Sequence, residues 1–82
     1  MAAVAHQARD VAVAFGTDTD PIRLGQFLKL ADLIDTGSDA KAVIAQGLVH
    51  VNDEVETRRG RRLSPGDVVR YGERAARAVP AD

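Results

Sequence analysis

The spacing of apolar side chains changes between residues 34 and 48, and that change most constrains the fold of this chain. From residue 24 to residue 34 they recur every three or four residues, at Leu24, Phe27, Leu28, Ala31 and Ile34. This spacing is typical of one face of a helix. From residue 48 apolar and polar residues alternate, with Val49 and Val51 on either side of His50, as in a half-buried strand. The pattern predicts an α+β fold with two short packed helices followed by a small antiparallel β-sheet.

The boundaries of both helices are marked by residues that start or stop a helix. Asp35-Thr36-Gly37 is expected to end the first, and Ser38 to cap the N-terminus of the second. Gly47 stands where the second helix should end. A short connection favours two helices packed against each other as a pair.

Turn residues divide the second half into strands. Asn52-Asp53 predicts a tight turn between two strands. Ser64-Pro65-Gly66-Asp67 has proline and glycine at the two central positions of a turn. A strand should follow, formed by Val68, Val69 and Tyr71. Arg77-Ala78-Val79 is expected to add a last strand at the edge of the sheet.

The chain has 82 residues, enough for one domain. We expect one folded domain over 21–79, an N-terminal extension over 1–20 and a tail over 80–82. Alternation at Val11, Val13 and Phe15 predicts a short strand in the extension.

Composition excludes several classes of protein. The chain contains no cysteine, which rules out disulfides and Cys-based zinc sites. A cytoplasmic protein is the simplest interpretation of this composition. Only three residues are aromatic, too few for a platform that stacks successive bases. No apolar stretch is long enough for a signal core or a membrane span, so no membrane partner is expected.

A net charge of −1 conceals an uneven distribution. Residues 1–20 have a net charge of −2, from Arg9 against three aspartates, whereas residues 54–77 have seven arginines, four acids and a net charge of +3. The centre of this region is Arg58-Arg59-Gly60-Arg61-Arg62. It is either a solvated face in an arginine-rich chain or an anion site, because crowded like charges repel and guanidinium groups suit phosphate.

Five segments in this order resemble the RNA-binding domain of ribosomal small-subunit protein S4, and in particular its stand-alone bacterial relatives of the YaaA and YbcJ type. They cover about residues 22–71 and read Arg23-Leu24-Gly25-Gln26-Phe27-Leu28-Lys29-Leu30-Ala31, Ser38-Asp39-Ala40-Lys41, Gly47-Leu48-Val49-His50-Val51-Asn52, Arg58-Arg59-Gly60-Arg61-Arg62-Leu63 and Pro65-Gly66-Asp67-Val68-Val69. Asp53 stands where the wider family has glycine, and it adds a negative charge near the expected RNA face.

The resemblance implies an RNA-facing surface made of the helical pair and a basic hairpin. The RNA-binding residues expected on it are Arg23, Gln26, Lys29, Ser38, Lys41, Gln46, His50, Asn52, Arg58, Arg59, Arg61 and Arg62. Read alone, several of them are ordinary surface residues, and Ser38 also suits a helix cap. Gln46 and His50 could face the same groove, although for each of them the ordinary surface role is the favoured interpretation.

Catalysis has little support in the sequence. There is no nucleophile–base arrangement and no phosphate loop, and His50 with His6 does not make a metal site. We therefore expect no enzyme activity, no metal, no cofactor and no small-molecule substrate.

The leading hypothesis is a monomeric protein that binds structured RNA, ribosomal or transfer RNA, and acts with the ribosome or in RNA assembly or quality control. It would recognise shape and backbone rather than base sequence. A second hypothesis is an adaptor whose arginines meet an acidic protein. A third is a non-specific DNA binder.

Overall fold

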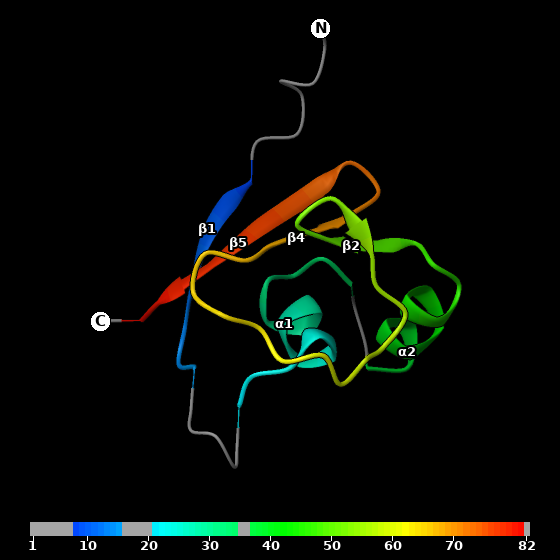
Figure 1. Ribbon diagram of the computed structural model, residues 1–82, viewed down its shortest axis with the longest axis horizontal. Helices are drawn as coiled ribbons and strands as arrows, with labels where there is room; N and C mark the ends of the chain where they lie inside the picture. The colour runs from blue at the N-terminus through cyan, green and yellow to red at the C-terminus, as the bar shows by residue number, and fades with distance from the viewer. Residues whose placement is uncertain (1–7, 16–20, 35–36, 82) are drawn as a thin grey trace, which may run out of the picture.

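The computed structural model describes residues 8–15, 21–34 and 37–81, without the side chain of Ser38. Within these residues one strand is followed by two helices and then by four strands (Figure 1): β1 Arg9–Val13, α1 Leu24–Leu30, α2 Gly37–Ala45, β2 Val49–Val51, β3 Glu54–Val55, β4 Val68–Tyr71 and β5 Arg74–Pro80. The predicted α+β class is confirmed. Asp35, Thr36 and most of the N-terminal extension lie outside the described residues.

The five strands form one sheet in the order β1-β5-β4-β2-β3. The pairs that join β2, β3, β4 and β5 are antiparallel, as predicted. β1 pairs with β5 in parallel, from Arg9 opposite Ala76 to Val13 opposite Pro80, so the sheet is mixed. The prediction that Arg77-Ala78-Val79 forms an edge strand was wrong, because β1 covers that edge and leaves β5 inside the sheet.

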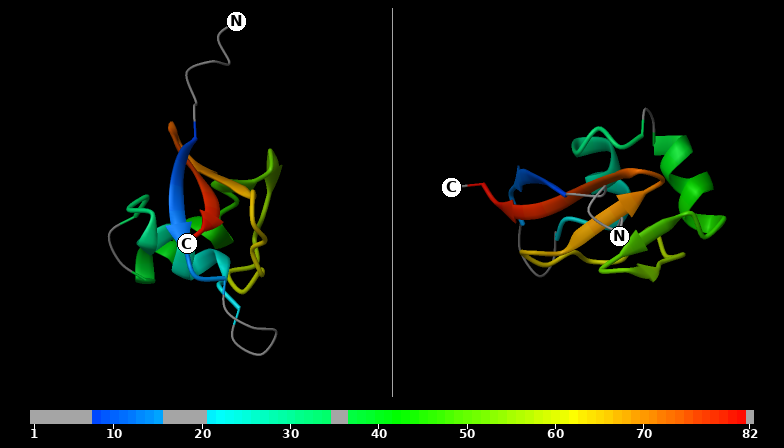
Figure 2. Two further views of the ribbon diagram at one scale, coloured as in Figure 1. Left: turned by 90° about the vertical axis from the view of Figure 1, so that its left-hand side faces the viewer. Right: turned by 90° about the horizontal axis from the view of Figure 1, so that it is seen from above.

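The core lies between the two helices and one face of the sheet (Figure 2). Alternation decides which strand residues enter it: Val49, Val69 and Ala76 are fully buried, whereas the intervening His50 and Arg70 face the other side. Phe27 of α1 and Ile44 of α2 fill the space above these strands. The apolar stripe in the sequence therefore marked the buried face of α1 correctly.

α1 ends earlier than the sequence predicted, at Leu30 instead of near Ile34. Asp32 has a φ of 61°, the left-handed conformation that usually ends a helix at glycine. Its N–H donates to the Lys29 carbonyl, and the N–H of Leu33 donates to that of Leu28, both at 3.0 Å. These two bonds form a Schellman motif. Ile34 is still buried because the chain folds back against the core after this motif.

α2 begins at Gly37, so Ser38 lies inside the helix and the prediction that it precedes the helix as N-cap was wrong. The predicted end at Gly47 is confirmed. Gly47 has a φ of 77°. The N–H groups of Gly47 and Leu48 donate to the carbonyls of Ile44 and Val43, both at 3.0 Å. The two helices are thus closed by the same motif, once with aspartate and once with glycine.

Both predicted turns are present. Asn52 and Asp53 have φ values of 53° and 71° and form a two-residue turn between β2 and β3. Gly66 has a φ of 93°, and the N–H of Asp67 donates to the Ser64 carbonyl at 3.0 Å. Aspartate therefore adopts the conformation expected of glycine at position 53.

The sequence predicted that the arginine run lies on a hairpin, and this prediction was wrong. The run lies in residues 56–67, here called the basic loop, which connect β3 to β4. Arg62 forms an isolated antiparallel bridge with Arg23, just before α1. The backbone of the run is thus paired with the segment leading into the first helix instead of with a neighbouring strand.

Candidate nucleic-acid interface

The basic loop is hydrogen-bonded to the start of α1. The N–H groups of Leu24 and Gly25, which have no partner within the helix, donate to the carbonyls of Arg61 and Arg59 at 2.8 and 3.1 Å. The N–H of Leu63 donates to the Ile22 carbonyl at 3.1 Å. The loop carbonyls therefore cap the helix, and the helix fixes the backbone that carries the arginines.

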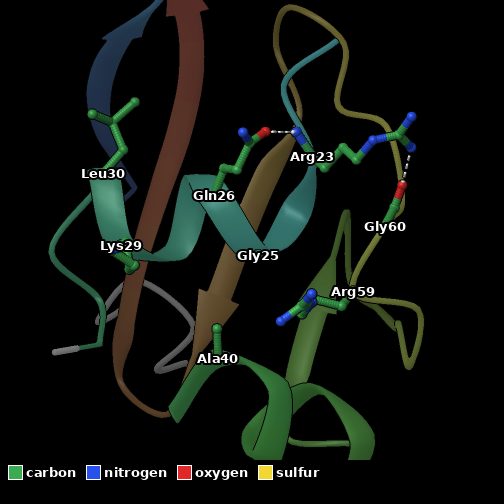
Figure 3. A pocket seen from close by; sticks show the side chains of 8 residues that line it. All are labelled: Arg23, Gly25, Gln26, Lys29, Leu30, Ala40, Arg59 and Gly60. Atoms are coloured by element: carbon green, nitrogen blue, oxygen red, sulfur yellow. Dashed lines mark hydrogen bonds between the residues drawn. The ribbon is translucent and has the colours of Figure 1, made fainter. Parts of the chain in front are cut away.

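Arg23 and Gln26 reinforce this junction. Gln26 Oε1 accepts a hydrogen bond from the N–H of Arg23 at 2.9 Å, which closes the first turn of α1. Nη1 of Arg23 donates to the Gly60 carbonyl at 2.7 Å (Figure 3). Both residues were predicted to bind RNA, and both also hold the helix and the loop together.

Glu56 pairs with two of the four arginines in the run. Its carboxylate accepts from Nε and from the backbone N–H of Arg58, each at 3.0 Å, and lies 3.3 Å from Nε of Arg61. Nη1 of Arg61 also lies 4.0 Å from Asp67. The side-chain hydrogen bond from Arg58 is the main reason why the pKa of Glu56 is lowered, and the same bond raises the pKa of Arg58.

A groove of about 700 Å³ opens between α1, α2 and the basic loop (Figure 3). Its lining combines basic residues with small and apolar ones: Arg23, Gly25, Gln26, Lys29, Leu30, Ala40, Arg59 and Gly60. The Arg59 guanidinium points into the space between the two helices, where Ala40 faces it from α2. The groove thus brings together residues from three separate segments.

Lys29 and Arg59 are the groove cations whose charge is not used inside the protein. Among the described residues, no acid or carbonyl pairs with either side chain, whereas Arg23 is bonded to Gly60. The stem of Arg59 lies across Gly25, where a Cβ atom would come within 2.7 Å of its Cγ. Glycine at this position therefore lets the arginine lie against the helix.

A family model described as an S4 domain matches residues 15–79. The chain belongs to the S4 domain family. It is also similar to a Bacillus subtilis (strain 168) protein named "Probable ribosome maturation protein RlbA", with 58% identity over 52 residues, which is 63% of this chain and 73% of that protein. The family predicted from the five segments is confirmed, and membership in it implies RNA binding.

In this S4 domain, four of the predicted RNA-binding residues line one groove: Arg23, Gln26, Lys29 and Arg59. Lys41 and Gln46 are exposed on α2 and just beyond its end, outside the groove lining. The side chain of Ser38 lies outside the described part of the structure. Arg58 and Arg61 lie beside the groove with Glu56, and Arg62 is exposed on the bridge to Arg23.

His50 and Asn52 lie elsewhere in the S4 domain. His50 alternates with two buried valines of β2, so it faces the side of the sheet opposite the helices and not the groove. Asn52 holds the β2–β3 turn to β4, because its side chain donates to Asp67 and accepts from the N–H of Val68, both at 3.0 Å. The Asn52 side chain therefore stabilises the contact between this turn and β4.

The sequence analysis missed the uncharged part of the groove and the acid beside it. Gly25, Leu30 and Ala40 line the groove, and Leu30 is 55% exposed although it is large and apolar. Leu30 lies off the buried stripe of α1, which was a signal in the sequence. Glu56, two residues before Arg58, was the other available signal.

Within residues 8–15, 21–34 and 37–81, no three His, Asp or Glu side chains gather in a way that could hold a metal ion. None of the helices in this part of the chain is long and apolar enough to span a bilayer.

Proposed function

We propose that this S4-domain protein binds structured RNA, ribosomal or transfer RNA, through the groove and the basic loop. It acts as a monomer in the cytoplasm, as a ribosome-associated factor in RNA assembly or quality control. The observation that carries the proposal is the pair of unpaired cations, Lys29 and Arg59, that line one groove from different segments of the chain. The name of the Bacillus subtilis relative, a probable ribosome maturation protein, supports the link to the ribosome.

The mechanism is electrostatic. Each cation that meets a phosphate displaces condensed counterions, so affinity falls steeply as the salt concentration rises. A cation that is already paired inside the protein must leave its acid first, whereas Lys29 and Arg59 can contact phosphate directly. Their backbones are fixed by α1 and by the loop–helix hydrogen bonds, so little order is lost on binding.

The binding unit is the segment 21–79, which contains both helices and the basic loop. Residues 1–20 form an extension whose strand β1 completes the sheet beside β5. The helices provide the shape that meets the RNA and the loop provides charge. Neither part is expected to bind well without the other, because the groove is lined by both.

The test is equilibrium binding to a labelled ribosomal RNA fragment and to a transfer RNA over a range of salt concentrations. We expect affinity to fall linearly on a log–log plot, and duplex DNA to compete poorly. Ribonuclease treatment of cell extracts should release the protein from ribosomal fractions. A partner retained after ribonuclease treatment, with no RNA affinity in vitro, would show a protein adaptor instead, and equal competition by DNA would show a general polyanion binder.

A further inference from the structure

The groove is more apolar than a surface that contacts only phosphates needs to be. Leu30 leaves 55% of its surface exposed there, while Gly25 and Ala40 leave its centre free of large side chains. Cations border this apolar centre on both sides, with Arg23 and Arg59 at the loop and Lys29 on α1. A ligand that fits must therefore present an apolar surface and negative charge close together.

We infer that the groove receives an unpaired nucleobase of the bound RNA, with the phosphates on either side of it held by Lys29 and Arg23. The inference rests on the proposed function and specifies which part of an RNA occupies the site. A base combines a flat apolar face with adjacent phosphates. In a continuous RNA helix the bases are stacked within the duplex, so only a base from a bulge, loop or end can enter.

The size of the groove agrees with this occupant. A volume of about 700 Å³ lies within the range of pockets that hold small molecules, so a single nucleobase can enter it. A duplex backbone lying across the groove would leave the apolar centre around Ala40 and Gly25 unfilled. A base inserted between the helices would fill it.

Arg59 is positioned to stack on such a base. Its carbonyl accepts from the N–H of Gly25 at 3.1 Å, and its stem lies against the same glycine, so only its planar end is free to adjust. Guanidinium planes stack on bases and carry a charge that favours the flanking phosphates. The two acids of the basic loop, Glu56 and Asp67, pair with Arg58 and Arg61 and not with Arg59.

The experiment compares three labelled hairpin RNAs that differ only at one position of the stem. One stem is continuous, one carries a bulged adenosine, and one carries an abasic residue at the bulge. We expect the wild-type protein to bind the adenosine bulge about tenfold more tightly than the other two, about 1.4 kcal/mol. The abasic RNA keeps the flexible backbone and phosphates of the bulge, so it isolates the contribution of the base.

Two variants locate the effect. Arg59→Lys keeps the charge but loses the plane, so it should reduce the preference for the adenosine bulge to within about twofold and leave the salt dependence unchanged. Leu30→Ala should reduce the preference in the same way. Arg77→Lys, on the opposite face of the sheet and paired with Asp10, is the matched control and should keep the wild-type preference.

Thermal unfolding of each variant separates loss of the fold from loss of the site. Equal affinity for the adenosine bulge and the abasic bulge would overturn the inference and leave the proposed RNA binding intact. Failure to bind any of the three RNAs would overturn the proposed function and the inference together. A preference that persists in Arg59→Lys and in Leu30→Ala would place the base elsewhere and also overturn the inference.

Discussion

Arg58 and Arg59 are neighbours in the same loop, yet the fold gives them opposite roles. Arg58 turns toward Glu56, which accepts two hydrogen bonds from its side chain, at 3.0 and 3.3 Å, and a third from its backbone. The Arg59 side chain turns toward α1 and lies across Gly25, and its guanidinium has no partner among the described residues. A run of like charges is therefore not one binding feature: part of it is neutralised within the loop, and part is left for a ligand.

Removal of both free groove cations should have the largest effect. The double variant Lys29→Ala, Arg59→Ala is expected to lose at least about tenfold in RNA affinity, because the positive charges of both unpaired groove cations disappear. The log–log salt slope should become shallower by about 2. The matched control is Arg70→Ala, Arg77→Ala, which removes the same charge from the other face of the sheet. An equal loss in both double variants would mean that total charge, and not the groove, determines binding.

Glu56→Gln should make Arg58 and Arg61 behave more like Arg59. Without the carboxylate the two arginines are free to meet phosphate, so the salt slope should become steeper. The loop loses the two ion pairs of Glu56, and we expect the free energy of unfolding to fall by about 1 kcal/mol. Urea titration measures the stability, and RNA binding at several salt concentrations measures the slope. An unchanged slope would show that Glu56 does not suppress these arginines.

The same carboxylate gives a dependence on pH with a defined sign. The pKa of Glu56 is lowered in the folded protein from its ordinary value of 4.5. Its pairing therefore stabilises the fold fully above the unfolded-state pKa, and this contribution is lost as the pH falls through the lower folded-state pKa. Unfolding free energies of the wild type and Glu56→Gln should differ at neutral pH and converge as the pH falls through the lowered pKa of Glu56. A difference that stays constant over this range would contradict the assignment.

The α+β class and the position of most elements could be predicted because they follow from apolar periodicity. The end of α1 could not, because it depends on the left-handed conformation of Asp32, whereas the sequence offered a stronger stop signal at Asp35-Thr36-Gly37. The parallel pairing of β1 with β5 joins the two ends of the chain, and local patterns carry no information about such distant partners. The turn at Asn52-Asp53 was predictable because both residues tolerate positive φ.

The candidate site was predictable by residue type but not by role. Charge and the family resemblance selected Arg23, Lys29 and Arg59, and the groove brings these three together. They also selected Asn52 and Arg58, whose side chains are bonded within the protein. Which arginine pairs with Glu56 depends on the direction in which the loop turns, and that direction is fixed by hydrogen bonds to α1 that no local pattern reveals.

Gly25→Ala should move Arg59 without touching its charge. The new Cβ would lie 2.7 Å from the Arg59 Cγ, so the arginine stem must shift away from α1. We expect RNA affinity to fall about threefold, while alanine's greater helix propensity, worth up to about 1 kcal/mol, offsets the local strain. Thermal unfolding and RNA binding should thus respond differently. A matched fall in both would mean that the substitution disrupts the helix start instead of the arginine alone.

Arg58→Ala should have the smallest effect and is the most direct test of the comparison. The Arg58 side chain is 77% exposed, so exposure alone would predict a strong RNA contact. Its guanidinium is bound to Glu56, however, and it lies outside the groove lining. We therefore expect RNA affinity to fall by less than about twofold, because the lost charge would act on the phosphates only from a distance at which salt screens it. Arg59→Ala, measured in parallel, should lose several-fold more. Equal losses would show that the ion pair opens on binding and that both arginines meet the RNA.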